Sequence, residues 1–173
     1  MKGGPLTLPT AARILSVGIG ELQITADRGA VLVSYGLGSC VALCLWDASR
    51  LVAGMAHVML PSAPNGSVPS STPAKFADQA IVAMLREFER LRVDRGRLVA
   101  KIAGGAQMFS AAGKPDLLAI GQRNVERIKE LLRLCQIPLV AEQTGGSAGR
   151  TVTFVPTTGR LLIKTIGSGE SEI

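Results

Sequence analysis

Cys40 and His57 are the side chains whose chemistry stands out in this sequence. His57 is the single histidine of the 173 residues, and Cys40 directly follows the small-residue run Gly36-Leu37-Gly38-Ser39. A thiolate and an imidazole form the smallest set for covalent catalysis, because the thiolate attacks and the imidazole takes up and returns the proton. The small residues let a substrate approach, and the backbone N–H groups around Gly38 and Ser39 are free to bind an oxyanion. The pattern indicates a cysteine-dependent catalyst.

Structural interpretations of the same residues stay open. Free cysteine is among the most buried residue types, and a lone histidine in an apolar strand is commonly a core residue. Cys44 lies in an apolar run and Cys135 on the inner stripe of a helix, which favours packing roles for both. A zinc site formed by the three cysteines and the histidine is conceivable, but the C-x-x-C spacing of structural zinc sites is absent.

Composition narrows the class of protein. The chain has 19 Lys and Arg against 13 Asp and Glu, a net charge of +6, which favours an acidic partner. Aromatic residues make up only 3%, and no zinc-finger, RNP-type or helix-turn-helix pattern occurs, so we expect no nucleic acid partner. No apolar run reaches the roughly 18 residues of a membrane span, so we expect no membrane insertion. We expect no secretory signal and a cytoplasmic protein with reduced cysteines.

Hydrophobic patterning predicts many short strands. Two nearly continuous apolar runs flank Asp47–Arg50 and predict a hairpin that is buried on both faces. With that turn, facing residues have numbers that sum to 97, so Trp46 faces Leu51 and Cys40 faces His57 on one side of the sheet. The expected strands are Ile14–Val17, Glu21–Ala26, Ala30–Tyr35, Val41–Trp46, Leu51–Leu60, Leu98–Ala103, Leu139–Gln143, Thr151–Val155 and Leu161–Ile166.

Two amphipathic helices separate these strands. The first is expected over Ala74–Arg92 with Thr72 as its N-cap, and the second over about Gln122–Gln136. The end of the first helix and the loop after it carry five arginines that could dock an acidic partner or form a solvated surface: Arg86, Arg90, Arg92, Arg95 and Arg97.

The elements predict one α+β domain, with a layered mixed or antiparallel β-sheet sandwich and two main helices. Residues 1–12 are expected to be a flexible tail, residues 13–168 the domain, and residues 169–173 a C-terminal tail. Glycine clusters at 104–105 and 145–149 lack the spacing of phosphate-binding motifs, so tight turns are favoured over ligand binding.

Five ordered blocks resemble the CheD family of bacterial chemotaxis proteins. The blocks are Gly36-Leu37-Gly38-Ser39-Cys40-Val41-Ala42, Ala56-His57-Val58-Met59-Leu60-Pro61, Ala100-Lys101-Ile102-Ala103-Gly104-Gly105-Ala106-Gln107-Met108-Phe109, Ile120-Gly121-Gln122-Arg123-Asn124-Val125 and Gly145-Gly146-Ser147-Ala148-Gly149-Arg150. The resemblance spans about residues 18–164.

This resemblance implies a cysteine hydrolase that converts selected glutamines of methyl-accepting chemotaxis receptors into glutamates through a thioester. It assigns Cys40 as nucleophile and His57 as general acid and base, with no metal or organic cofactor. The family usually has a third catalytic residue, a threonine six positions before the cysteine, where this chain has Ser34. Serine keeps the hydroxyl that can orient the imidazole but lacks the methyl that restricts its rotamer.

The resemblance also implies a fold similar to the catalytic domain of cytotoxic necrotizing factor toxins, and the phosphatase CheC as a partner. An alternative function is a non-catalytic module that keeps the fold and binds receptors or CheC.

Overall fold

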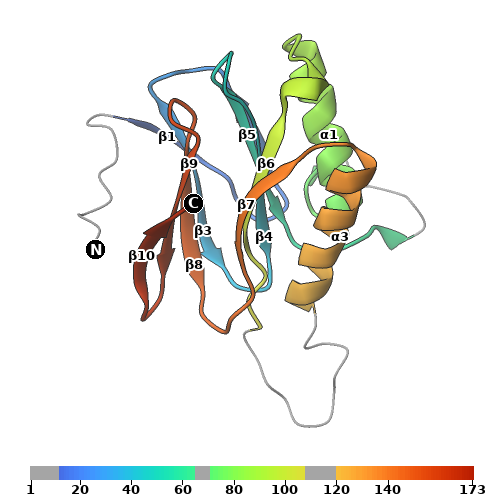
Figure 1. Cartoon of the computed structure of the whole chain (residues 1–173). Coiled ribbons are helices and arrows are strands. Elements are labelled where there is room, and N and C mark those ends of the chain that lie inside the picture. The colour runs from blue at the N-terminus through green and yellow to red at the C-terminus, as the bar shows by residue number, and fades with distance from the viewer. Residues whose placement is uncertain (1–11, 65–70, 108–119) are drawn as a thin grey trace.

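The computed structural model describes residues 12–64, 71–107 and 120–173. The expected N-terminal tail lies almost wholly outside these ranges. Figure 1 shows three layers, with two helices against one face of a first sheet and a second sheet against its other face. Both sheets are mixed, because each contains one parallel strand pair beside antiparallel ones. The expected α+β sandwich with two main helices is confirmed.

The central sheet lies between the helices and the outer sheet. Its strand order is β2-β5-β4-β6-β7, with the bounds Leu22–Thr25, Val52–Val58, Val41–Asp47, Val99–Gly104 and Leu139–Thr144. The outer sheet has the order β1-β3-β8-β9-β10, with the bounds Arg13–Ser16, Ala30–Leu37, Arg150–Val155, Arg160–Thr165 and Gly169–Glu172.

Strands β4 and β5 are buried on both faces, as the apolar runs predict. Leu43 and Leu45 face the helices, whereas Ala42 and Cys44 belong to the apolar cluster between the sheets. Each fully buried aliphatic side chain of this kind contributes about 1.5–3 kcal/mol of hydrophobic stabilisation. The hairpin therefore contributes side chains to two hydrophobic cores, one between the helices and the central sheet and one between the two sheets.

Helices α1 (Ala77–Arg90) and α3 (Ile120–Leu134) cover the face of the central sheet that is turned away from the outer sheet. The 3-10 helix η2 (Arg95–Arg97) follows α1. Gly54 of β5 lets α1 pack closely, because a Cβ there would lie 3.0 Å from Met84 and 3.2 Å from Phe88. Within the described ranges, no helix has the length and apolar composition that a membrane crossing requires.

The start of α1 differs from the prediction that Thr72 caps a helix from Ala74. The helix begins at Ala77 after Phe76, which makes no side-chain capping bond. The backbone before the helix hydrogen-bonds to other segments of the chain instead of continuing the helix. The Ala74 N–H donates to the Gly20 carbonyl, and Phe76 forms a parallel bridge with Leu60. Residues 73–75 form a turn and a bend, closed by the Lys75 N–H donating to the Thr72 carbonyl, so the helix starts only after the Phe76 bridge.

The C-terminal residues also differ from the prediction, because residues 169–173 are not a tail. Gly169–Glu172 form β10, which pairs antiparallel with β9. The Lys101 ammonium donates hydrogen bonds to the Gly159 carbonyl (2.7 Å) and the Ile173 carbonyl (2.9 Å). A charged donor from the central sheet thus fastens the last strand of the outer sheet.

Candidate active site

The connection between β3 and β4 carries the chain from the outer sheet to the central sheet. Ser34 lies in the second half of β3, and Cys40 immediately precedes β4. Because β5 runs antiparallel to β4, His57, near the end of β5, lies at the same end of the sandwich. The topology therefore gathers three residues from three chain segments at one edge of the inter-sheet layer.

The register of the β4–β5 hairpin corrects the prediction from the sequence. Trp46 pairs with Ala53 rather than Leu51, and His57 pairs with Ala42 rather than Cys40, so the paired numbers sum to 99. The loop is one residue later than expected, over residues 48–51, with Asp47 paired to Val52.

The cause of this shift is the geometry of the turn. The Asp47 carboxylate accepts hydrogen bonds from the Ser49 and Arg50 backbone N–H groups, and Leu51 takes a left-handed backbone with φ of 55°. Moving every partner by two residues leaves each side chain on its original face. Cys40 therefore lies diagonal to His57 but on the same side of the central sheet, against the inter-sheet apolar cluster.

His57 and Ser34 form a hydrogen bond across the two sheets. The distance between His57 Nδ1 and Ser34 Oγ is 2.7 Å, and both side chains are buried. Ser34 Oγ donates to the Val17 carbonyl oxygen at 3.0 Å, and the same oxygen lies 3.4 Å from His57 Nδ1. The sequence pattern did not indicate Val17, because a backbone carbonyl has no signature of its own.

This network determines the tautomer of the neutral imidazole. The Ser34 hydroxyl uses its proton on Val17, so its oxygen accepts from Nδ1–H of His57. The proton of the neutral ring is then on Nδ1, and Nε2 carries the free lone pair. Among the residues that the structure describes, Nε2 has no hydrogen-bond partner although it is buried. It is available to accept a proton from a neighbouring group.

Burial favours the neutral forms of both candidate groups. It raises the pKa of the Cys40 thiol. It also lowers the pKa of His57, against smaller opposing effects of the Val17 carbonyl and the Glu21 carboxylate. A buried site disfavours charge on either side chain. The resting state therefore has a neutral Cys40 thiol and a neutral His57 imidazole.

A glycine turn after β6 supports the Cys40 segment. The Gly105 N–H donates to the Cys40 carbonyl and the Ala106 N–H to the Gly38 carbonyl, both at 2.8 Å. Gly104 has a φ of +119°, and a Cβ on it would lie 2.3 Å from the Cys40 carbonyl oxygen. This position accepts only glycine, which agrees with the interpretation of the cluster as a tight turn.

The Cys40 turn also presents backbone N–H groups. Within the described part of the chain, the backbone N–H groups of Gly38, Ser39 and Cys40 donate no hydrogen bond. Such groups at the mouth of a buried layer can bind a developing negative charge.

Two buried polar residues that the sequence interpretation missed hold this region. Arg150 donates to the carbonyl oxygens of Gly104 (2.8 Å), Gln143 (3.3 Å) and Gly145 (2.6 Å). Asn124 of α3 donates to backbone carbonyls beside both candidate catalytic residues. A polar residue on the otherwise apolar inner stripe of an amphipathic helix was the available signal for Asn124.

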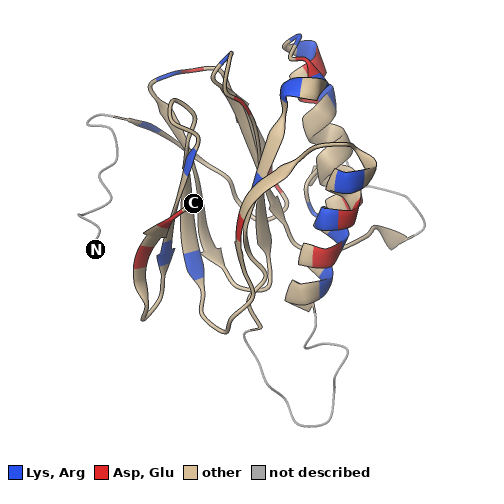
Figure 2. Cartoon of the chain, viewed as in Figure 1, with Lys and Arg blue, Asp and Glu red and all other residues tan. Residues whose placement is uncertain are grey.

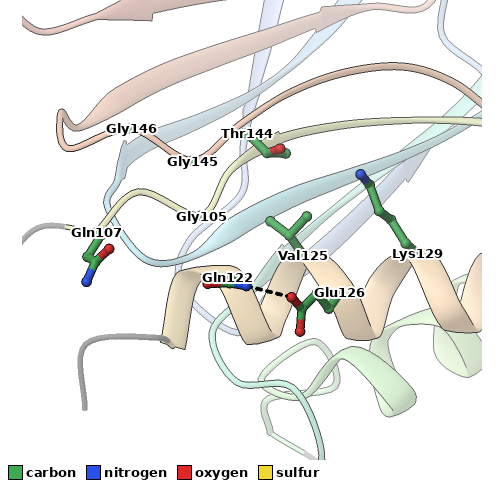
Figure 3. Close-up of a pocket in the computed structure, with 9 residues that line it drawn as sticks. All are labelled: Gly105, Gln107, Gln122, Val125, Glu126, Lys129, Thr144, Gly145 and Gly146. Carbon is green, nitrogen blue, oxygen red and sulfur yellow. Dashed lines mark hydrogen bonds between the residues drawn. The ribbon is translucent and has the colours of Figure 1, made fainter. Parts of the chain in front are cut away.

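A cavity of about 390 Å³ lies beside the glycine turn (Figure 3). It is lined by Gly105, Gln107, Gln122, Val125, Glu126, Lys129, Thr144, Gly145 and Gly146. The candidate catalytic side chains are not among its walls, and Gly105 connects the two places through its bond to Cys40.

The other candidate residues lie apart from this site. Cys44 is buried in β4, and burial raises its pKa further. Cys135 follows α3, and its carbonyl accepts from Arg95. Across the residues that the structure describes, no group of three or more His, Cys, Asp or Glu is arranged to hold a metal ion.

The five-arginine surface lies at the opposite end of the hairpin. Arg50, in the β4–β5 turn, donates to the carbonyls of Leu91 and Arg92. The seven residues of β4 separate this end from Cys40 by about 20 Å at roughly 3.3 Å per residue. Figure 2 shows basic and acidic residues interspersed at this end of α1.

The fold and site define an α+β sandwich protein with a cysteine, a histidine and a serine gathered where the chain passes between its two sheets. A family model described as CheD chemotactic sensory transduction matches residues 59–165. The chain therefore belongs to the CheD family. That match begins after Cys40 and His57, whereas the full-length relatives span both.

Relatives in several organisms align over nearly the whole chain. A protein of Desulfitobacterium hafniense named "Probable chemoreceptor glutamine deamidase CheD" is 46% identical over 94% of this chain and 99% of its own length. "Chemoreceptor glutamine deamidase CheD" of Halalkalibacterium halodurans is 46% identical over 92% of this chain and 98% of its own length. A protein of Archaeoglobus fulgidus, also named "Probable chemoreceptor glutamine deamidase CheD", is 48% identical over 89% of this chain and 94% of its own length.

A solved structure titled "Crystal structure of Bacillus licheniformis hypothetical protein YfiH" is also similar. It has 14% sequence identity and a TM-score of 0.46, over 80% of this chain and 61% of that one.

Proposed function

We propose that this chain hydrolyses the side-chain amides of glutamines in chemoreceptors to glutamates, with Cys40 as nucleophile and His57 as general base and acid. The names of the relatives supply the substrate and the reaction. The observation that carries the residue assignment is the hydrogen bond of His57 Nδ1 to Ser34, which leaves Nε2 free on the side of the sheet that Cys40 shares.

The first half-reaction forms a thioester. The proton of the Cys40 thiol moves to His57 Nε2 as the sulfur attacks the amide carbon, and the carbonyl oxygen becomes an oxyanion. The free N–H groups of Gly38, Ser39 and Cys40 stabilise this charge. The C–N bond then breaks, and the proton on Nε2 goes to the nitrogen, which leaves as ammonia.

The second half-reaction releases glutamate. His57 Nε2 takes a proton from water as its oxygen attacks the thioester carbon. The C–S bond breaks, and the sulfur recovers the proton from Nε2. The protein ends in its starting state, and the products are a glutamate side chain and ammonia.

Ser34 acts as the orienting residue for His57. When Nε2 gains a proton, the imidazolium donates through Nδ1 to Ser34 Oγ, and hydrogen bonds from charged donors are stronger than those from neutral ones. Since burial favours the neutral resting pair, this bond contributes most after proton transfer, where it lowers the barrier.

We also propose a cytoplasmic location, CheC as a binding partner, and a fold similar to the cytotoxic necrotizing factor catalytic domain. The three free cysteines support a reducing compartment. The helix–sheet–sheet layering supports the fold similarity.

Mass spectrometry of a chemoreceptor cytoplasmic fragment tests the proposed function. We expect receptor glutamines to gain the mass that accompanies conversion of an amide into an acid. Cys40→Ala abolishes the conversion and leaves the fold intact, because the half-buried thiol contributes little packing. Activity retained by a homogeneous Cys40→Ala preparation contradicts the assignment.

Cys44→Ala is the matched control for this experiment. It removes a buried sulfur that the proposed reaction does not use, so it lowers stability by about 1 kcal/mol or somewhat more and keeps activity. Cys135→Ala serves in the same way. A receptor-binding module without catalysis would bind the fragment and leave its mass unchanged.

A further inference from the structure

Asn124 is a buried polar residue on the face of α3 that packs against the central sheet. Its relative exposure is 0%. Its Nδ2 donates to the Ser39 carbonyl oxygen at 3.0 Å and to the Met59 carbonyl oxygen at 2.9 Å. One side-chain amide therefore uses both of its N–H groups on backbone carbonyls that are 20 residues apart in the chain.

These carbonyls belong to the two segments that carry the proposed catalytic pair. Ser39 directly precedes Cys40, and Met59 follows His57 by two residues. Beyond the β4–β5 ladder, Asn124 is the one side chain in the described ranges that hydrogen-bonds to both segments. It links them where the ladder has ended.

The orientation of the amide follows from its partners. Both neighbours are carbonyl oxygens, which only accept, so the NH2 group must face them and Oδ1 must face away. Oδ1 is buried and has no partner among the described residues. An unpaired buried acceptor opposes the stabilisation that the two donated bonds supply, so the net contribution of Asn124 to stability is smaller than two hydrogen bonds suggest.

The placement of α3 does not depend on Asn124. Gly121, one turn earlier, lies so close to the glycine turn that a Cβ on it would be 2.5 Å from the Gly105 carbonyl oxygen. Val125 packs against the same turn, since a Cβ on Gly105 would be 2.6 Å from its Cγ2. These contacts dock the helix through shape.

We propose that Asn124 is a positioning residue for the reaction. It holds the Ser39–Cys40 backbone at a fixed separation from the segment that follows His57, so the thiol stays in reach of Nε2 and the turn keeps its N–H groups aimed at the oxyanion. This inference rests on the proposed function. Small displacements of reacting groups have large kinetic effects, whereas substrate binding elsewhere on the surface is unaffected.

The test compares Asn124→Leu with Ile128→Ala. Leucine has a similar size without the donors, so α3 keeps its packing. Ile128 is one turn further along α3, fully buried, and makes no hydrogen bond to either segment. For each variant, the melting temperature, the kcat and KM of receptor deamidation, and the pH dependence of Cys40 alkylation by iodoacetamide are measured.

We expect Asn124→Leu to lower kcat by roughly 10- to 100-fold with KM within about threefold of the wild type. The pH dependence of alkylation shifts toward that of His57→Ala, because the displaced thiol no longer delivers its proton to the imidazole. In Ile128→Ala the melting temperature falls, but kcat and the alkylation profile stay at wild-type values.

Asn124→Ser is the second variant, because it keeps one donor on a side chain too short to reach both carbonyls. If the proposal is right, Asn124→Ser lowers kcat and shifts the alkylation profile in the same direction as Asn124→Leu. Wild-type kcat and alkylation profile in either folded variant overturn the positioning role, and so does loss of folding in both variants, which assigns Asn124 to stability. A wild-type protein that deamidates no receptor fragment, with alkylation insensitive to His57→Ala, instead overturns the proposed function.

Discussion

Ser34→Ala tests the orienting role of the hydroxyl. The substitution removes the 2.7 Å partner of His57 Nδ1 and leaves only the Val17 carbonyl at 3.4 Å. A net hydrogen bond contributes about 0.5–1.5 kcal/mol when both groups are neutral and about 1.5–3 kcal/mol when one is charged. The difference, about 1–1.5 kcal/mol, stabilises the imidazolium formed by proton transfer.

This difference predicts a fall in kcat of roughly tenfold, because each 1.4 kcal/mol changes a rate about tenfold. The loss stays moderate because Val17 still accepts from Nδ1–H and keeps the ring in its tautomer. The assay is ammonia release from a chemoreceptor cytoplasmic fragment at saturating substrate. Ser34→Thr, unlike Ser34→Ala, keeps the hydroxyl and is expected to keep the wild-type kcat, provided that the added methyl fits at this buried position.

Thr25→Ala is the matched control, because Thr25 is a buried hydroxyl residue whose Oγ1 accepts from the Asp27 N–H at a distance from the site. It loses a comparable hydrogen bond, so we expect a lower melting temperature and unchanged kcat. A Ser34→Ala enzyme with kcat within about twofold of the wild type refutes the reasoning, since the bond would then be equally strong in both protonation states.

Three further predictions concern the surroundings of the site. The ultraviolet thiolate signal that Cys40→Ala removes titrates above the ordinary thiol pKa, because burial disfavours the anion; a signal already present at neutral pH indicates a preformed ion pair. Gly104→Ala lowers the melting temperature and kcat well beyond Gly145→Ala, because both have positive φ but only the first places a Cβ against backbone; equal effects contradict the crowding argument. Arg123→Glu, which alters the α3 surface near the site, raises KM more than Arg90→Glu, and the reverse order supports docking through the remote arginine surface.

The sequence predicts most of the elements because long apolar runs leave few alternatives. The double burial of β4 and β5 and the stripe of α1 follow from periodicity alone. The hairpin register does not follow from periodicity. It depends on which backbone N–H groups donate to the Asp47 carboxylate and on a left-handed backbone at Leu51, a conformation that leucine rarely adopts. A local turn thus decides a long-range pairing.

The C-terminal strand escapes prediction for another reason. Gly169–Glu172 has the sequence Gly-Glu-Ser-Glu, which carries no apolar alternation. Its conformation comes from pairing with β9 and from Lys101, far away in the sequence. Contacts of this kind are tertiary and leave no local pattern.

The candidate site divides in the same way. Cys40 and His57 are visible in the sequence through their rarity and their neighbours, whereas Ser34 is identified only through the family resemblance. Asn124 and Arg150 act on backbone carbonyls, so their partners have no sequence signature. Only the folded chain shows which carbonyls these are.

Ser34 and His57 belong to different sheets, and the consequence is mechanical. Sliding one layer against the other stretches the 2.7 Å bond between them, together with the other side-chain bonds that join the sheets, such as those of Lys101 and Arg150, before any strand ladder is broken. The geometry of the proposed catalytic centre is therefore sensitive to displacement of one sheet relative to the other. Substitutions that soften the inter-layer filling far away, such as those at Met55 or Phe154, can slow turnover while the protein still melts as one unit. Loss of activity on warming then precedes loss of the fold.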